Sequence, residues 1–272
     1  MTQTVEAKGF SIPLVGLCTW MLRGRECARL VQQAIRLGYR HIDTAQMYDN
    51  EREVGEGVRA SGKRSEVIVT TKVQPTLLAP PDLERSVKES LARLRLDHID
   101  LLLIHWPNPR VPLSETLGAM AKMKQAGYAR AIGVSNFTVA LLDEANRVSP
   151  EPLICNQIEC HPFLDQRKVI EACNRHGMAV IAYSPIARGG AKGDEVLQRI
   201  GQAHKKSAAQ VCLRFLVQQG IAVIPRTSRI ERLEENISIF DFTLSEHEMA
   251  EIRNLARRSG RIVDWTWSPK WD

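Results

Sequence analysis

Eight short runs rich in aliphatic and β-branched residues recur along this 272-residue chain, and each is followed by a segment of helical pattern. Parallel strands need a long crossover between them, usually a helix, so this alternation predicts a parallel sheet. Eight such units close a (β/α)8 TIM barrel, which typically takes about 250 residues. The predicted strands are residues 13–18, 39–43, 66–72, 99–105, 129–135, 153–159, 178–184 and 221–225.

The segments between these runs carry one apolar face each. Apolar residues at i, i+3, i+4, i+7 and i+8 are typical of an amphipathic helix. The clearest examples are Cys27, Leu30, Val31, Ala34 and Ile35, then Leu83, Val87, Leu91 and Leu94, then Leu113, Leu117 and Met120.

No linker or low-complexity segment interrupts the alternation, so we predict one barrel domain over residues 1–272. Residues 4–12, TVEAKGFSI, precede the first predicted strand and read as a hairpin that turns at Lys8 and Gly9. We expect this hairpin to plug the floor of the barrel.

Composition excludes several classes of protein. An apolar content of 44% and a charged content of 25% are ordinary for a soluble globular protein. No apolar run approaches the roughly 18 residues of a membrane span, and MTQTVEAKGFSIP lacks the apolar core of a signal peptide. The net charge of +6 permits anionic ligands, but no long basic run indicates nucleic acid binding. We therefore expect a cytoplasmic protein that acts on a small molecule. We also expect a monomer, although composition does not determine the oligomeric state.

The cysteines fit the same expectation. They show no CxxC spacing and lie in otherwise apolar segments, which is typical of reduced, buried thiols in a cytosolic protein. Neither Cys160-His161 nor Cys173-x-x-His176 has the spacing of a standard zinc site, so we expect no metal. The six are Cys18, Cys27, Cys155, Cys160, Cys173 and Cys212.

Polar residues end nearly every predicted strand. One acid at a strand end is often a turn former, but the reactive face of a barrel is built from the carboxyl ends of all its strands. Such residues at almost every end therefore indicate a site. They are Asp43, Lys72, His105, Ser135-Asn136, Asn156-Gln157, Tyr183-Ser184 and Arg226-Thr227-Ser228.

The stretch HIDTAQMYDNE adds a phenol, Tyr48, five residues after Asp43. A free tyrosine has a pKa of about 10, and a nearby ammonium lowers it. Lys72 can do this if Asp43 keeps it charged, and His105 can hydrogen-bond beside the phenol. Such a set would protonate a carbonyl oxygen while another reagent attacks the carbon. Since no serine-histidine-acid set or metal cage is apparent, hydride from a nicotinamide is the natural reagent.

These stretches resemble those of the aldo-keto reductase family over almost the whole chain. Within the family, the chain is most similar to the bacterial 2,5-diketo-gluconate reductases of the B type and their methylglyoxal-reducing relatives. The matching stretches are GYRHIDTAQMYDNEREVG, VIVTTKV, DLLLIHWP, AIGVSNF, NQIECHP, IAYSPI, VIPRTSRIERLEEN and FDFTL.

The resemblance implies a catalytic tetrad of Asp43, Tyr48, Lys72 and His105. Tyr48 would be the general acid, Lys72 paired with Asp43 would lower its pKa, and His105 would orient the carbonyl. It also implies NADP(H). The implied contacts are Ser135, Asn136 and Gln157 to the carboxamide, Tyr183 to the nicotinamide ring, Ser184 and Pro185 to the pyrophosphate, Arg226, Thr227, Ser228 and Arg232 to the 2′-phosphate, and Glu235 and Asn236 to adenine.

Two positions depart from the family pattern. Arg226 replaces a lysine, which keeps the charge and adds bidentate geometry, so a preference for NADP should survive. Cys18 replaces a glycine in GLCTW, where a side chain could crowd the nicotinamide or the substrate.

Beyond Arg226, Ser228 is followed three residues later by Glu231, a spacing that predicts a helix cap. The free N–H groups at the start of a helix attract phosphate.

Trp20 and Trp106 each follow a strand end and are predicted to wall the substrate pocket. We expect His41, two residues before Asp43, to fill a layer of the barrel, and His161 to be structural or to lie at the edge of the cofactor. The tail RIVDWTWSPKWD either packs on the barrel side or closes over the mouth; the resemblance favours the mouth for its first part.

The predicted function is NADPH-dependent reduction of small aldehydes, dicarbonyls and keto-sugars. The resemblance leaves a non-enzymatic relative as one alternative, although the tetrad is intact. A sugar-phosphate isomerase on the same barrel is another. Fold alone does not separate these alternatives, whereas the residues of the site do.

Overall fold

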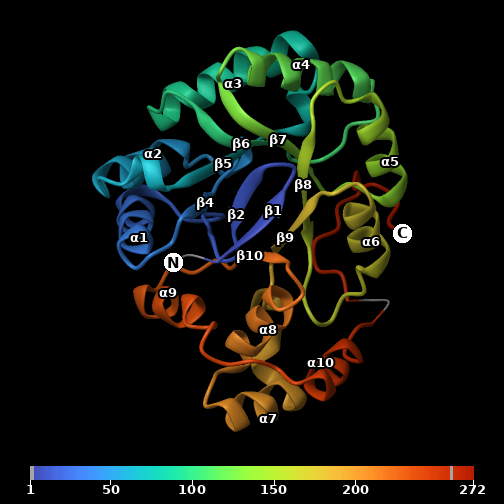
Figure 1. The fold of residues 1–272 in the computed structure, drawn as a ribbon. Coiled ribbons are helices and arrows are strands. Elements are labelled where there is room, and N and C mark those ends of the chain that lie inside the picture. Colours follow the sequence, from blue (N-terminus) through green and yellow to red (C-terminus); the bar gives the residue numbers. More distant parts are fainter. Residues whose placement is uncertain (1–2, 258–259) are drawn as a thin grey trace.

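A sheet of eight parallel strands lies at the centre of the computed structural model, which describes residues 3–257 and 260–272 (Figure 1). Each strand pairs with the next along the chain, and bridges Val15–Val223 and Cys18–Arg226 join the first strand to the last. The predicted barrel is therefore confirmed. Its strands are β3 (Leu17–Cys18), β4 (His41–Asp43), β5 (Ile68–Val73), β6 (Ile99–Ile104), β7 (Ala129–Ser135), β8 (Leu153–Glu159), β9 (Ala179–Tyr183) and β10 (Ala222–Ile224).

Helices surround the sheet (Figure 1). The residues predicted to form the apolar faces of α1 and α3 are all buried, and each leucine, isoleucine or valine among them contributes about 1.5–3 kcal/mol. None of the helices described is long and apolar enough to cross a membrane. They are α1 (Gly24–Arg36), α2 (Glu51–Ala60), α3 (Pro80–Leu94), α4 (Leu113–Gln125), α5 (Val139–Val148), α6 (Arg167–Arg175), α7 (Glu195–His204), α8 (Ala208–Val217), α9 (Ile230–Ile237) and α10 (Glu246–Arg253).

Alternation along each strand divides the core in two. Leu17 belongs to the cluster between sheet and helices, whereas its neighbour Cys18 belongs to the cluster inside the barrel. On β4, Ile42 faces the helices, so His41 and Asp43 face inward. His41 is fully buried and its Nε2 lies 2.9 Å from Thr70 Oγ1. Burial lowers its pKa to about 4, so it is a neutral filler of a barrel layer, as predicted.

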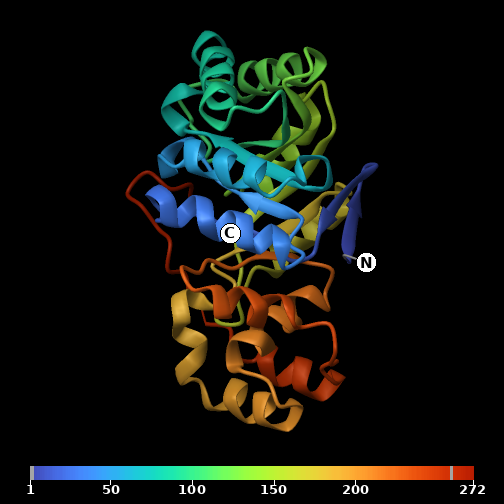
Figure 2. The ribbon, with the colours of Figure 1, turned by 90° about the vertical axis from the view of Figure 1, so that its left-hand side faces the viewer.

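The predicted N-terminal hairpin is present. Strands β1 (Thr4–Ala7) and β2 (Phe10–Pro13) pair antiparallel, and Lys8 and Gly9 turn between them with φ of 49° and 81°. Ala7 and Ile12 are buried in the cluster inside the barrel, so the hairpin plugs the floor. Figure 2 shows the hairpin and the C-terminal tail on opposite sides of the barrel.

The tail reaches the mouth, as expected for its first part. The carboxylate of Glu159, at the end of β8, accepts hydrogen bonds from the backbone of Ile262 at 2.7 Å and Val263 at 2.8 Å. Further on, the ring of Trp267 lies 5.1 Å from that of Trp106, centroid to centroid. The tail therefore runs along the carboxyl ends of the strands.

Candidate active site

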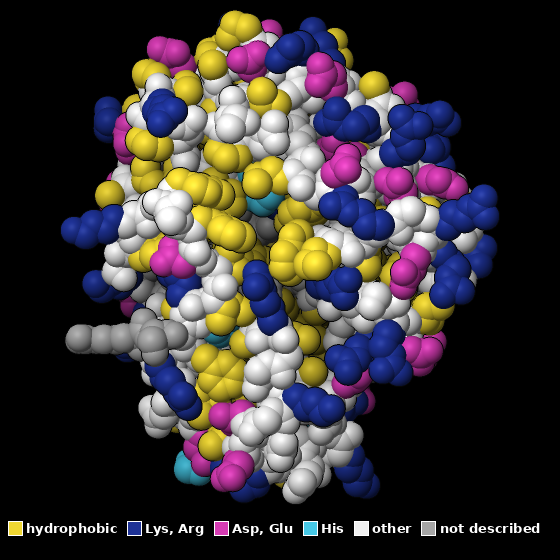
Figure 3. All heavy atoms as spheres, turned by 180° about the vertical axis from the view of Figure 1, so that it is seen from behind, with side chains coloured by type: hydrophobic (Ala, Val, Ile, Leu, Met, Phe, Trp, Pro, Cys, Tyr) yellow, Lys and Arg dark blue, Asp and Glu magenta, His cyan; other side chains and the backbone are white. Residues whose placement is uncertain are grey.

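The four tetrad residues meet at the carboxyl ends of neighbouring strands. Asp43 ends β4, Lys72 lies near the end of β5, and His105 follows β6. Tyr48 ends the 3-10 segment η1 (Gln46–Tyr48), which the loop after β4 forms. Figure 3 shows the molecule from the side opposite the hairpin, where hydrophobic side chains gather around a central hollow.

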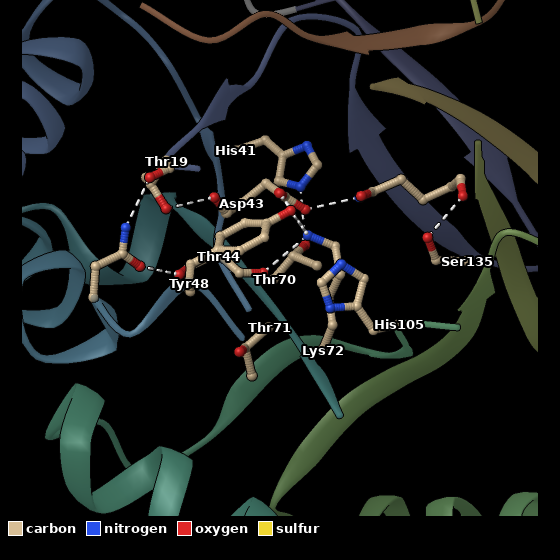
Figure 4. Close-up of polar contacts among 12 residues, drawn as sticks. Thr19, His41, Asp43, Thr44, Tyr48, Thr70, Thr71, Lys72, His105 and Ser135 are labelled. Atoms are coloured by element: carbon tan, nitrogen blue, oxygen red, sulfur yellow. Dashed lines mark hydrogen bonds and ion pairs between the residues drawn. The ribbon is translucent and has the colours of Figure 1, made fainter. Parts of the chain in front are cut away.

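Asp43 and Lys72 form a fully buried ion pair (Figure 4). Lys72 Nζ donates to Asp43 Oδ2 at 2.7 Å and to the backbone oxygen of Thr44 at 3.0 Å. Gln157 Nε2 donates to the other carboxylate oxygen at 2.7 Å. Burying a charge is costly unless it is paired and hydrogen-bonded, and both charges here are.

The phenol of Tyr48 continues this chain of contacts. Lys72 Nζ also donates to the Tyr48 hydroxyl at 3.3 Å and lies 4.8 Å from the ring centroid. The ring of His105 meets the phenol edge-on, with centroids 5.6 Å apart. Carboxylate, ammonium, phenol and imidazole are therefore brought together as the sequence predicts.

The pKa of Tyr48 differs from our expectation. We expected Lys72 to lower it, but in this structure burial, the largest cause, together with Cys18 and Asp43 raises the pKa of Tyr48 well above its usual value. The phenol is therefore protonated at neutral pH. Burial and the charge of Lys72 lower the pKa of His105, so that its imidazole is neutral. Its Nδ1 has no hydrogen-bond partner among the described residues.

The residues predicted to hold a nicotinamide form one connected group. Ser135 Oγ donates to the backbone oxygen of Gln157 at 2.8 Å, and Asn136 Nδ2 donates to that of His105 at 2.9 Å. The Tyr183 hydroxyl donates to Asn136 Oδ1 at 2.8 Å. A hydroxyl, two amides and an aromatic ring thus converge beside the tetrad. Ser184, with φ of 51°, and buried Pro185 start the loop that follows β9.

The basic residues after β10 are arranged differently from our prediction. Helix α9 begins at Ile230 with Arg229 as N-cap and no side-chain cap, so the predicted cap by Ser228 is wrong. Thr227 Oγ1 instead accepts the hydrogen bond from Arg229 N at 3.0 Å, which stabilises the turn before the helix. Arg226 Nε donates to the backbone oxygen of Trp20 at 3.2 Å.

The two predicted adenine contacts occupy different surroundings. The carboxylate of Glu235 accepts a hydrogen bond from Ser207, the N-cap of α8, and Asn236 is buried. Arg232 is exposed on α9.

The predicted pocket walls also differ from each other. Trp20 is 37% exposed, and the guanidinium of Arg188 lies 4.8 Å from the centroid of its ring. Trp106 is only 4% exposed, and the rings of Trp267 and Trp271 lie steeply inclined to it with centroids 5.1 Å and 6.0 Å away.

Sequence reasoning missed two residues that support the site. Asn50 is buried, and its Nδ2 donates to the backbone oxygens of Thr19 at 2.7 Å and Leu22 at 3.0 Å, which joins the loops after β3 and β4. Glu159 holds the tail. Asn50 follows β4 in the stretch HIDTAQMYDNE, and Glu159 ends β8 in the stretch NQIECHP. Their position in these two stretches was the signal by which the sequence could have revealed them.

The chain is similar to known proteins over most of its length. The model of the Aldo/keto reductase family matches residues 15–257. Methylglyoxal reductase DkgB of Escherichia coli O157:H7 is 39% identical over 266 residues, covering 96% of this chain and 100% of the relative. Glyoxal reductase of Bacillus subtilis (strain 168) is 39% identical over 246 residues, covering 90% and 89%. A solved structure assigned as a 2,5-diketo-D-gluconic acid reductase B superposes with a TM-score of 0.98 at 46% identity, covering 100% of this chain and 98% of the other.

Proposed function

The chain belongs to the aldo/keto reductase family, and from that premise we propose that it reduces small aldehydes, dicarbonyls and keto-sugars to alcohols with NADPH. The observation that carries this proposal is the buried contact chain from Asp43 through Lys72 to the Tyr48 hydroxyl, beside a neutral His105. Its relatives' names, methylglyoxal reductase and glyoxal reductase, support the choice of small carbonyl compounds.

The residues present fit a nicotinamide dinucleotide. Asn136 and Gln157 offer amide groups at the ends of β7 and β8, and Tyr183 offers a ring that can stack on a flat heterocycle. When bound, the cofactor supplies hydride to the carbonyl carbon. Arg226 and Arg232 lie in the loop before α9 and on α9 itself, so they offer charge for a 2′-phosphate, which NADPH has and NADH lacks.

Tyr48 is the proposed proton donor to the carbonyl oxygen. Its raised pKa keeps the phenol protonated before reaction, and Lys72 at 3.3 Å stabilises the phenolate once the proton has left. Asp43 keeps Lys72 charged in a buried place. The neutral imidazole of His105 can donate a hydrogen bond to the carbonyl oxygen and orient it without competing for the proton.

Replacement of Tyr48 by phenylalanine tests the proposal. Tyr48→Phe removes the proton donor, so turnover should fall by the roughly 100-fold to 10,000-fold that general acid catalysis supplies, while the dissociation constant of NADPH changes little. Tyr128→Phe is the matched control, since Tyr128 lies at the opposite, amino-terminal end of β7. A Tyr48→Phe enzyme that keeps more than about a tenth of wild-type turnover, with chemistry rate-limiting, would show that Tyr48 is not the acid.

A further inference from the structure

The loop that carries Tyr48 needs contacts with the rest of the barrel to fix its position. Within the loop, Tyr48 N donates to Ala45 O at 3.0 Å and Asp49 N donates to Gln46 O at 3.2 Å. These local bonds shape the turn of η1, but they do not determine where the turn lies relative to the neighbouring strand. Lys72, the partner of the phenol, is on that neighbouring strand, β5. Contacts between the loop and β5 therefore decide where the phenol meets the ammonium.

Gln46 makes such a contact with its side-chain amide. Its Oε1 accepts from the backbone N of Gln74, directly after β5, at 3.0 Å. Its Nε2 donates to Ser86 Oγ and Ser90 Oγ, each at 3.1 Å, and both serines are buried on α3. Ser86 Oγ donates its own hydrogen to Leu83 O at 2.9 Å, which leaves its lone pairs for Gln46. One amide thus joins the loop to the end of β5 and to the helix that follows.

The bond between Gln46 and Gln74 lies close to both reactive groups along the chain. Gln74 comes two residues after Lys72. In the same way, Tyr48 comes two residues after Gln46. Lys72 Nζ adds a second link at 3.0 Å to Thr44 O, but this link runs through a long, flexible side chain. Gln46, in contrast, binds the backbone at the end of the strand.

The other side of the loop is held to a different part of the barrel. Asn50 bonds to the loop after β3, and the guanidinium of Arg23 donates to the backbone oxygen of Tyr48. These contacts hold the loop, but their partners do not belong to β5. The contact that refers the loop to the strand of Lys72 through its backbone is that of Gln46.

We propose that Gln46 is a positioning residue for the reaction: its side-chain amide holds the loop of Tyr48 against the end of β5 and so sets the distance from the phenol hydroxyl to Lys72 Nζ. This inference rests on the proposed role of Tyr48 as proton donor. Gln46 itself exchanges no proton with the substrate, and it acts through the backbone of η1.

Two substitutions break the bond from its opposite ends. Gln46→Met keeps the length of the side chain and removes the amide. Gln74→Pro removes the N–H and suits the local backbone, since Gln74 has φ of −70° and proline fixes φ at about −65°. A displacement of about 1 Å can cost about 100-fold, so we expect the rate of reduction to fall about 5-fold to 100-fold in each variant. Gln46→Glu keeps an oxygen acceptor and Gln74→Ala keeps the N–H, so these two should stay within about threefold of wild type.

The measurement separates positioning from loss of stability. Reduction of methylglyoxal is followed in a single turnover with NADPH, so that release of the cofactor does not mask the rate. The dissociation constant of NADPH should be unchanged in all four variants, because the loop of Tyr48 supplies none of the proposed cofactor contacts.

Gln218→Met is the matched control. Gln218 makes a similar two-way amide contact with the backbone of Leu244, at 2.8 Å and 3.0 Å, but at the end of α8 that leads into β10, on the face of the barrel opposite the site. Urea denaturation should show a loss of stability comparable to that of Gln46→Met. The rate of reduction should stay within about twofold of wild type.

A rate within about threefold of wild type in Gln46→Met or in Gln74→Pro would overturn the proposal, as would a Gln46→Glu enzyme as slow as Gln46→Met. An equal fall of the rate in Gln218→Met would overturn it too, because general destabilisation would then be the cause.

Failure of the proposed function is a different result, in which wild type reduces no carbonyl compound. Crystal structures then decide the role of Gln46. The distance from Lys72 Nζ to the Tyr48 hydroxyl should exceed the wild-type 3.3 Å in Gln46→Met and Gln74→Pro, and an unchanged distance would count against the proposal.

Discussion

Removing Asp43 should destabilise the protein far more than removing an exposed carboxylate in an equally short ion pair. Asp43 and Lys72 are both fully buried, with 2.7 Å between their charged atoms. In Asp43→Ala, the partners that remain for the buried ammonium among the described residues are Thr44 O and the Tyr48 hydroxyl. Breaking a buried pair in this way costs about 3–5 kcal/mol, a large share of a typical free energy of unfolding of about 5–15 kcal/mol.

A surface pair provides the matched control. Arg85 and Asp82 also lie 2.7 Å apart, but their side chains are 62% and 48% exposed. Asp82→Ala should cost no more than about 1 kcal/mol, because solvent screens the pair. Urea denaturation at neutral pH measures both changes. A thermal scan should place Asp43→Ala roughly 6–20 °C below wild type.

The double variant shows whether the unpaired charge is the cause. Asp43→Ala with Lys72→Met removes both charges, and an apolar replacement of a buried pair is often neutral or stabilising, so it should be at least as stable as Asp43→Ala alone. The reasoning would be refuted if the double variant lost as much stability as the single variants Asp43→Ala and Lys72→Met lose when their separate losses are added.

Two further predictions concern the cofactor and the tail. Arg232→Ala should weaken NADPH binding by about 1.5–3 kcal/mol, the range for a charged hydrogen bond, and should leave NADH binding nearly unchanged. Titration of both cofactors measures this difference. Equal losses of affinity for the two would contradict the proposed 2′-phosphate contact. Deleting the chain from Ile262 onward should raise KM across a panel of aldehydes, dicarbonyls and keto-sugars while kcat changes little, because Trp267 and Trp271 then no longer cover Trp106. A panel in which one substrate is preferred by more than about 10,000-fold would contradict the proposed range of small aldehydes, dicarbonyls and keto-sugars.

The placement of the residues at the strand ends could be predicted from the sequence, because a barrel brings the carboxyl ends of all its strands to one face. Once eight parallel strands are recognised, Asp43, Lys72 and His105 must lie on one face, and alternation along β4 turns Asp43 inward. Local pattern was enough for the hairpin as well, since Lys8 and Gly9 supply the turn conformation themselves.

What could not be predicted depends on contacts between distant segments. The start of α9 at Ile230 follows from a loop in which Thr227, not Ser228, accepts the backbone hydrogen bond. The path of the tail is set by Glu159, about a hundred residues earlier, whose carboxylate has partners that no local pattern reveals.

The direction in which the pKa of Tyr48 shifts also depends on contacts between distant segments, and it bears on the proposed mechanism. A proton donor must be protonated before transfer and stabilised after it, and one nearby ammonium serves only the second need. Burial, with the negative charge of Asp43, serves the first need by penalising the phenolate, while Lys72 at 3.3 Å is placed to stabilise the charge that transfer creates. Both conditions hold together because Asp43 fixes the ammonium in place: without Asp43, the ammonium that faces the phenolate would be a buried charge left unpaired, which is costly.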